Sequence, residues 1–145
     1  MADLINLYSK RILALAADVP RTERLAQPDG SACKRSPLCG STVTVDVNVR
    51  DGLIAEFGQD VKACALGQAS AAVLGANVIG LSLDDVRGVR DGLEAMLKTG
   101  GPPPAGAFEQ LSLLQPARDF KNRHASIMLA YDATVEAMES VGAPA

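Results

Sequence analysis

The first twenty residues carry a helical pattern of apolar and polar positions. Apolar side chains recur at a spacing of three to four residues, whereas the polar side chains fall mostly elsewhere. Proline disfavours a continuing helix, so we expect an amphipathic helix of about four turns that ends at Pro20. The predicted inward positions are Leu4, Leu7, Tyr8, Ile12 and Leu15.

The middle of the chain changes to a period of two. From Thr42 to Val49 apolar valines alternate with polar residues, which is typical of a strand with one buried and one solvated face. Asp51-Gly52 separates this run from a second β-rich run, LIAEFG, and Asp-Gly at such a place is a strong hairpin signal. A turn signal at Pro28-Asp29-Gly30 precedes a further short strand that leads to Pro37. The pattern therefore predicts a three-stranded antiparallel sheet.

The remaining sequence predicts helices. Residues 64–80 are rich in Ala, Gly and Ser, and such small side chains allow a helix to approach its neighbours closely. Ser82 and Asp85 nearly form a capping box at the start of the next helix. We expect a short helix at 108–114, before Pro116, and a last helix over about 122–141. A helix, then strands, then helices indicates an α+β fold of two layers, and without internal repeats we expect a single domain over residues 1–145.

Composition narrows the functional classes. The chain has 145 residues, a net charge of −3 and 3% aromatic residues, which argues against a nucleic-acid-binding protein. It contains neither an apolar run long enough to span a membrane nor a secretory signal pattern. Three cysteines, an odd number, fit a reducing compartment better than a disulfide framework. We expect a soluble, cytoplasmic protein with no membrane partner.

Three residues stand out as candidates for chemistry. Cys39 lies in a turn before the first hairpin strand, Cys64 lies at the expected N-terminus of a helix, and His124 is the only histidine. A hairpin brings the start of its first strand next to the end of its second, so we expect Cys39 and Cys64 to meet at one end of the sheet. Two thiols and one imidazole would supply three ligands for zinc or for an iron–sulfur cluster. Structural roles remain the alternative, because a free cysteine usually packs as a small apolar residue; Cys33 has no evident partner.

The segment DGSACKRSPLCGSTVTVDVNVRDGLIAEFGQDVKACALGQASAAVLGANVIGLSLDDV resembles the NifU/IscU-type iron–sulfur cluster scaffold family, including its SufU-like branch. The likeness continues through LLQPARDFKNRHASIMLAYDATVEAM. It implies a non-enzymatic scaffold that accepts sulfur from a cysteine desulfurase, binds iron or zinc, and holds a [2Fe–2S] cluster for transfer to apo iron–sulfur recipient proteins. The first two ligand cysteines of the family fall on Cys39 and Cys64.

The sequence departs from the family pattern at two ligand positions. Ser41 stands where the family usually has an aspartate. The third cysteine of the family falls on Ser126 in an ungapped alignment, or on Ala125 if the alignment is shifted so that His124 matches the family histidine. We therefore expect a metal site of Cys39, Cys64 and His124 with a reduced ligand set.

Two other functions remain open at this point. One is a zinc-dependent sulfur acceptor that partners a cysteine desulfurase, and the other is a metal-free interaction module derived from the scaffold fold. The missing third cysteine favours the scaffold or the interaction module, because a sulfur relay needs a spare nucleophilic thiol.

Overall fold

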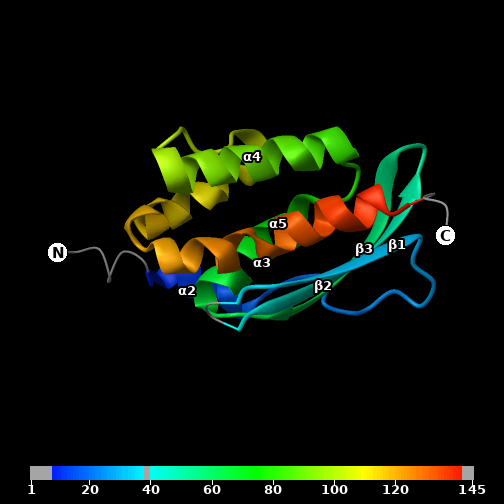
Figure 1. Ribbon diagram of the computed structural model, residues 1–145, viewed down its shortest axis with the longest axis horizontal. Coiled ribbons are helices and arrows are strands. Elements are labelled where there is room, and N and C mark those ends of the chain that lie inside the picture. The colour runs from blue at the N-terminus through cyan, green and yellow to red at the C-terminus, as the bar shows by residue number, and fades with distance from the viewer. Residues whose placement is uncertain (1–7, 38–39, 142–145) are drawn as a thin grey trace.

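The computed structural model describes residues 8–37 and 40–141, which form a helix, a three-stranded antiparallel sheet and a set of helices (Figure 1). This order confirms the predicted α+β fold. In chain order the elements are α2 (Lys10–Ala17), β1 (Gly30–Arg35), β2 (Thr42–Arg50), β3 (Leu53–Lys62), α3 (Ala65–Asn77), α4 (Leu83–Thr99), the 3₁₀ helices η1 (Gly106–Asp119) and η2 (Lys121–Arg123), and α5 (His124–Glu139).

Within the described residues, the helix α2 starts later than the predicted N-terminal helix. The Ser9 side chain accepts a hydrogen bond from the backbone N–H of Ile12 at 3.2 Å, and α2 begins at Lys10. A serine that caps a helix in this way has non-helical backbone angles, so the predicted helix cannot continue through Ser9. Ile12 is fully buried, as predicted; Leu4 and Leu7 lie outside the described residues.

The sheet confirms the predicted hairpin. β2 lies in the middle, between β1 and β3, and Thr42 at the start of β2 pairs with Lys62 at the end of β3. Asp51 and Gly52 both have positive φ angles, 55° and 78°, as the favoured two-residue hairpin turn requires. β3 continues to Lys62, beyond the predicted run that ended at residue 58.

The predicted solvated face of β2 is in fact buried at Asp46. Its carboxylate accepts hydrogen bonds from Arg24 at 2.6 and 3.1 Å, from the Leu25 N–H at 3.0 Å and from the Ser31 hydroxyl at 2.6 Å. The expectation that polar positions on this strand face solvent is therefore wrong here, because the chain before β1 folds back over this part of the sheet. Gly58, the neighbour of Asp46 on β3, lets the Glu23 carbonyl lie where a Cβ would be.

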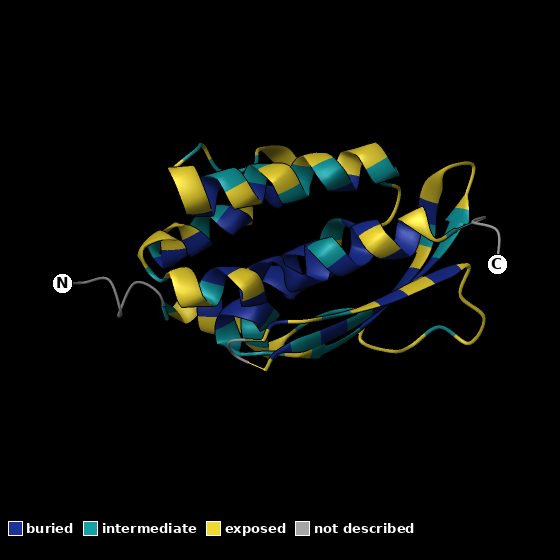
Figure 2. Ribbon diagram, viewed as in Figure 1, coloured by how far each residue is buried: buried dark blue, intermediate teal, exposed yellow. Residues whose placement is uncertain are grey.

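The helices build outward from the other face of the sheet. α5 packs on β1 and β2, α3 packs beside it and on β3, and α4 packs on the side of α5 away from the sheet (Figure 1). Figure 2 shows that α5 is buried along most of its length, whereas the outer face of α4 is exposed. The predicted capping box is present at Ser82 and Asp85.

The short helix predicted before Pro116 is instead a 3₁₀ helix of 14 residues that passes through the proline. Its buried residues recur at every third position, which matches the three residues per turn of a 3₁₀ helix. The same spacing of apolar residues is visible in the sequence, but the prediction of a short helix at 108–114 did not take it into account. The buried positions are Phe108, Leu111, Leu114 and Ala117.

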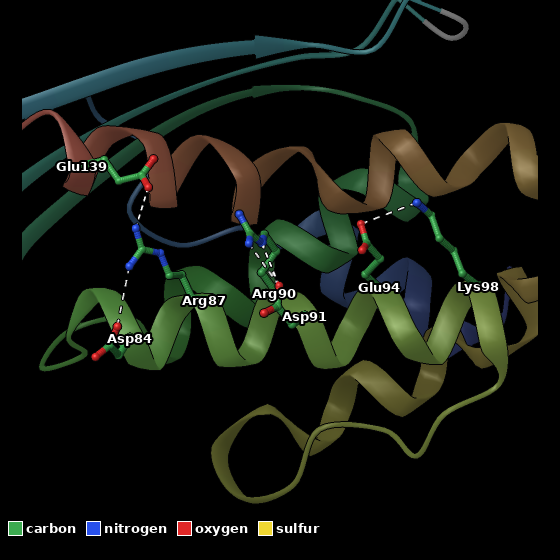
Figure 3. A network of polar contacts seen from close by, with 7 residues as sticks. All are labelled: Asp84, Arg87, Arg90, Asp91, Glu94, Lys98 and Glu139. Atoms are coloured by element: carbon green, nitrogen blue, oxygen red, sulfur yellow. Dashed lines mark hydrogen bonds and ion pairs between the residues drawn. The ribbon is translucent and has the colours of Figure 1, made fainter.

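Ion pairs lie along α4, and one of them joins α4 to α5 (Figure 3). Arg87 bonds Glu139 of α5 at 2.6 Å and lies 3.7 Å from Asp84, so it joins the two helices. Such exposed pairs each contribute less than about 1 kcal/mol. They orient α4 but do not account for the stability of the fold.

We expect Asp46→Asn to lower the free energy of unfolding by about 2 kcal/mol at pH 7, because an amide replaces a buried charged acceptor. Burial raises the pKa of Asp46, but the hydrogen bonds from Arg24, Ser31 and Leu25 outweigh it, so the pKa lies below its ordinary value. A lowered pKa in the folded state stabilises the protein above the unfolded pKa, and this stabilisation is lost as the pH falls. The difference in free energy of unfolding between wild type and Asp46→Asn should therefore shrink below about pH 4.

Urea unfolding followed by circular dichroism at pH 7 and at lower pH measures this effect. Asp84→Asn is the matched control, because Asp84 is an exposed carboxylate in a weak surface pair. The role given to Asp46 would be contradicted if both variants lost the same free energy of unfolding. It would also be contradicted if the difference in stability between Asp46→Asn and wild type did not change with pH.

Candidate functional site

The candidate site lies at the end of the sheet where α3 and α5 both begin (Figure 1, left). Because Thr42 pairs with Lys62, the residue before β2 and the residues after β3 are neighbours. Cys64 is the N-cap residue of α3, and its backbone carbonyl accepts the N–H of Gln68 at 2.9 Å. The hairpin geometry thus brings Ser41 and Cys64 to one place.

The first turn of α5 completes this cluster. The Ser126 hydroxyl oxygen lies 3.6 Å from the Cys64 sulfur and 3.0 Å from the Ser41 hydroxyl oxygen. Ser41 and Ser126 are 3% and 1% exposed, whereas Cys64 is partly exposed. The site therefore has a closed side of two hydroxyls and an open side at the thiol.

A glycine allows the two helices to approach at this point. A Cβ on Gly67 of α3 would lie 2.7 Å from the Ser126 hydroxyl oxygen and 2.8 Å from the Ala63 Cβ. Both distances are shorter than van der Waals contact, so a side chain here would push α5 away from Cys64. Gly67 is needed for close packing, a role that the small-residue composition of this helix indicated.

The surroundings of Cys64 favour its thiolate. Burial is the largest single effect and raises the pKa of the thiol, but four other interactions together outweigh it. These are hydrogen bonds from the Gly67 N–H, the Ser126 hydroxyl and the Leu66 N–H, and the positive charge of Arg123. The pKa of Cys64 consequently lies below its ordinary value, as expected for a thiol beside free N–H groups at a helix N-terminus.

His124 lies on another face of α5. Its Nε2 is 2.8 Å from the carbonyl oxygen of Ala117 and 3.1 Å from that of Arg118, and it is 8% exposed. Residues two positions apart on an α-helix point about 200° apart, so the direction that brings Ser126 to Cys64 takes His124 toward η1. Together with Lys98 of α4, His124 lines a groove of about 870 Å³.

The structure separates the two candidate positions for the third family cysteine. Ser126 is buried against Cys64, whereas Ala125 is exposed on the rim of the groove that His124 lines. Cys33 is exposed on β1, opposite Thr44. Cys39 lies outside the described residues.

Sequence reasoning missed two features of this site. It treated Ser41 and Ser126 as lost ligands and did not foresee that their hydroxyls bond to each other. It also gave no role to Arg123, whose charge acts on Cys64. In residues 8–37 and 40–141 the side chains of His, Cys, Asp and Glu form no cluster of three or more that could hold a metal ion.

Within the described part of the chain, no helix combines the length and apolarity that a membrane span requires.

No protein-family model matches the chain. A curated relative, the iron-sulfur cluster assembly scaffold protein IscU of Thermotoga maritima, is 23% identical over 95% of this chain and 96% of its own length. A SUF-system scaffold structure (FiSufU) from Fervidobacterium islandicum has a TM-score of 0.83 at 16% identity, over 92% of this chain and 98% of that one, which shows a shared fold.

The crystal structure of the N-terminal part of a NifU-like protein from Brucella abortus is more similar in sequence. It has a TM-score of 0.93 and 45% identity, and the match covers 96% of each chain. Identity at this level over almost the full length, together with the cysteine at the N-terminus of α3 and the hairpin before it, shows the relationship. The chain belongs to the NifU/IscU-type iron–sulfur cluster assembly scaffold family.

Proposed function

We propose that this protein is a scaffold on which an iron–sulfur cluster is assembled and from which it is passed on, with Cys64 and Cys39 as its thiolate ligands. The observation that carries the proposal is the contact between Cys64 and Ser126 at 3.6 Å. Ser126 stands where the ungapped resemblance places the third ligand cysteine of the family, so the geometry of a ligand site is kept although one ligand type has changed. The names of the relatives support the same function.

The cluster is the cargo of such a protein, and the donor set decides how well it is held. Cys64, with its lowered pKa, fits a soft iron site, because the thiolate rather than the thiol binds metal. The hydroxyls of Ser41 and Ser126 are hard donors that stay protonated near neutral pH. The chain therefore offers at most two thiolates, fewer than the four donors that a stable cluster requires.

Among the three predicted ligands, His124 contributes least to metal binding in this proposal. Its Nε2 lies within hydrogen-bond distance of the Ala117 and Arg118 carbonyl oxygens, so Nε2 carries the proton and donates to them. Only the lone pair of Nδ1 could then bind a metal. The contacts of Nε2 direct the ring toward η1 rather than toward Cys64. We propose that His124 mainly holds η1 against α5, and that it is a weak ligand at most.

The sulfur of the cluster would come from a cysteine desulfurase as a persulfide. The Cys64 thiolate attacks the outer sulfur of the donor's persulfide, a new sulfur–sulfur bond forms at Cys64, and the donor cysteine leaves as its thiolate. The partly exposed position of Cys64 permits such an approach. Two electrons from a reductant outside the chain must then reduce this sulfur to sulfide as it leaves Cys64 for iron, which returns Cys64 to the thiolate that can act as a ligand. Apo iron–sulfur proteins would receive the finished cluster.

Anaerobic reconstitution with iron and sulfide tests the proposed function. We expect wild type to show cluster absorption, and Cys39→Ala and Cys64→Ala to lose most of the bound iron and sulfide, because each removes a charged ligand. Cys33→Ala is the matched control, since Cys33 is an exposed cysteine on β1, and should keep the wild-type content. If Cys39→Ala and Cys64→Ala both keep the wild-type content of bound iron, these cysteines are not the ligands. If wild type itself binds no iron, the metal-free interaction module is favoured instead.

Restoring a thiolate should strengthen the site. Ser126→Cys places a third sulfur beside Cys64, and we expect metal affinity to rise by about tenfold or more, since even changes around the ligands alter affinities by 10- to 100-fold. Ala125→Cys is the matched control, because Ala125 is exposed on the rim of the other groove and its replacement should change little. The measurement is competition with a metal chelator; a stronger gain in Ala125→Cys would contradict the placement of Ser126.

The pKa of Cys64 can be tested in metal-free protein. Ser126→Ala removes a hydroxyl that donates to the thiolate, so we expect the pKa of Cys64 to rise. The rate of Cys64 alkylation by iodoacetamide as a function of pH, followed by peptide mass spectrometry, measures it. Ser140→Ala, at the far end of α5, should leave the profile unchanged; identical profiles for wild type and both variants would exclude the hydrogen bond.

A further inference from the structure

A groove of about 870 Å³ lies between α4 and α5, at the end where η1 and η2 meet α5. On α5 its wall is formed by His124, Met128 and Asp132, which lie four residues apart and therefore share one face of the helix. With a rise of about 1.5 Å per residue, this wall is about 12 Å long. From α4, Glu94 and Lys98 line the groove (Figure 3). The volume is within the range of ligand-binding pockets, so the groove can hold part of another molecule.

The carboxylate of Asp132 is the unusual group in this groove. It is half-buried, yet within residues 8–37 and 40–141 it takes part in no hydrogen bond and no ion pair. Burial raises the pKa of Asp132 above its ordinary value, and the neighbouring cations offset only part of this rise. A half-buried charge without a partner costs stability, so Asp132 is a candidate for binding a ligand rather than for holding the fold.

The cations around Asp132 are already paired with other carboxylates. Three of them, one from β1 and two from α4, lie close enough for their charges to act on Asp132. The existing pairs are Arg90–Asp91 and Lys34–Glu136, each at 3.1 Å, and Lys98–Glu94 at 3.6 Å. The charge of Glu94 also acts on Asp132 and, like burial, disfavours its ionised form. Residues 1–7, 38–39 and 142–145 contain no lysine or arginine, so we expect the cation that pairs with Asp132 to come from another molecule.

The end of the groove at η1 and η2 carries the opposite charge. Arg118 and Lys121 line it, both are exposed, and neither forms an ion pair within the described residues. Asp119 lies between them in the sequence and offsets only one of the two positive charges. This end therefore attracts an anionic group.

Between the two charged ends the groove is apolar. Met128 lies midway between His124 and Asp132 along α5, and Leu97 of α4 adds a second large apolar side chain. A complementary ligand therefore carries a cation, an apolar group and an anion in a row, with the two charges about 12 Å apart. A free amino acid holds its two charges too close together to reach both ends.

We propose that this groove binds an extended segment of a partner protein, with a lysine or arginine of the segment at Asp132. An apolar side chain of the segment lies on Met128 and Leu97, and a glutamate or aspartate lies at the cationic end. Alternate side chains of an extended chain point the same way, and a rise of about 3.3 Å per residue places the first and fifth side chains about 13 Å apart. The expected pattern is therefore acid-x-apolar-x-base, in either chain direction. Ser126 lies on another face of α5, so the partner leaves Cys64 accessible.

A capped peptide, Gly-Glu-Ser-Leu-Ser-Lys-Gly, is the probe that tests the inference. Titration of isotope-labelled wild type, followed by its amide chemical shifts, measures both the affinity and the location of binding. We expect shifts along α4 and α5 beside the groove, with a dissociation constant about tenfold lower than for the same peptide with glutamine in place of lysine, because a hydrogen bond to a charged group contributes about this much. Glutamine in place of the glutamate should weaken binding by only about threefold, because Arg118 and Lys121 are exposed.

The preference for lysine should depend on Asp132. Asp132→Asn should bind the lysine and glutamine peptides equally. Asp84→Asn is the matched control, because it removes an exposed carboxylate of α4 outside the groove, and it should keep the tenfold preference of wild type. If N-acetyl-lysine amide binds wild type as tightly as the peptide does, a small cation is the ligand and the proposed segment is overturned.

The thermal stability of the peptide-free protein gives a second, independent readout. Asp132→Asn should raise the unfolding temperature at pH 7 by about 3 °C, because it removes a charge without a partner, whereas a structural role of Asp132 predicts a fall. The pKa of Asp132 is raised in the folded state, so its charge destabilises the fold only above the unfolded pKa. The gain should therefore disappear below about pH 4, where the carboxylate is protonated in both states.

Several results would overturn the inference. They are a charged peptide that shifts no signal beside the groove, lysine and glutamine peptides that bind wild type alike, and a preference or a loss of thermal stability in Asp132→Asn. The comparison of peptides on wild type decides the matter even if Asp132→Asn does not fold. None of these measurements involves metal, so a failure of this inference is distinguishable from a failure of the proposed function.

Discussion

The close packing of α5 against its neighbours is the constraint on which the rest of the structure depends. α5 contacts β1, β2, α3 and α4, and most of its residues are buried. Close approach is possible because small residues stand at the contacts: Gly67 of α3 faces Ser126, and Gly30 of β1 lies against the Ala137 carbonyl. A helix held from several sides has little freedom to rotate, so the direction of every side chain in its first turn is determined.

Hydrogen bonds between buried polar groups fix the register of α5 against α3. The Ser70 hydroxyl donates to the Ile127 carbonyl at 2.8 Å, and the Tyr131 hydroxyl donates to the Ser70 carbonyl at 3.0 Å. Burial raises the pKa of Tyr131, which keeps this hydroxyl protonated as a donor. Apolar packing alone would tolerate small shifts along the helix, whereas these directional bonds do not.

The same register creates the chemistry of the site. It places the Ser126 hydroxyl on Cys64, where it favours the thiolate together with the N–H groups of α3. The first turn of α5 thus has two roles on two faces, since Ser126 faces the thiol and His124 holds η1.

The sequence alone determined most of the fold. The valine alternation, the Asp-Gly turn and the capping box at Ser82 are local signals, and each predicted its element because the energy that selects it comes from neighbouring residues. The same hairpin signal predicted that the start of β2 would lie beside the end of β3. The meeting of Cys39 with Cys64 stays a prediction, because Cys39 lies outside the described residues.

Only the tertiary structure decided which residues of α5 face Cys64. Periodicity specifies that Ala125 and Ser126 point in different directions, but it cannot say which direction meets another helix, because that depends on contacts between residues far apart in sequence. The burial of Asp46 was unpredictable for the same reason: its partner Arg24 reaches it through a fold of the preceding loop. Likewise, the sequence could not show that His124 contacts the Ala117 and Arg118 carbonyls, because these contacts exist only where η1 packs against the start of α5.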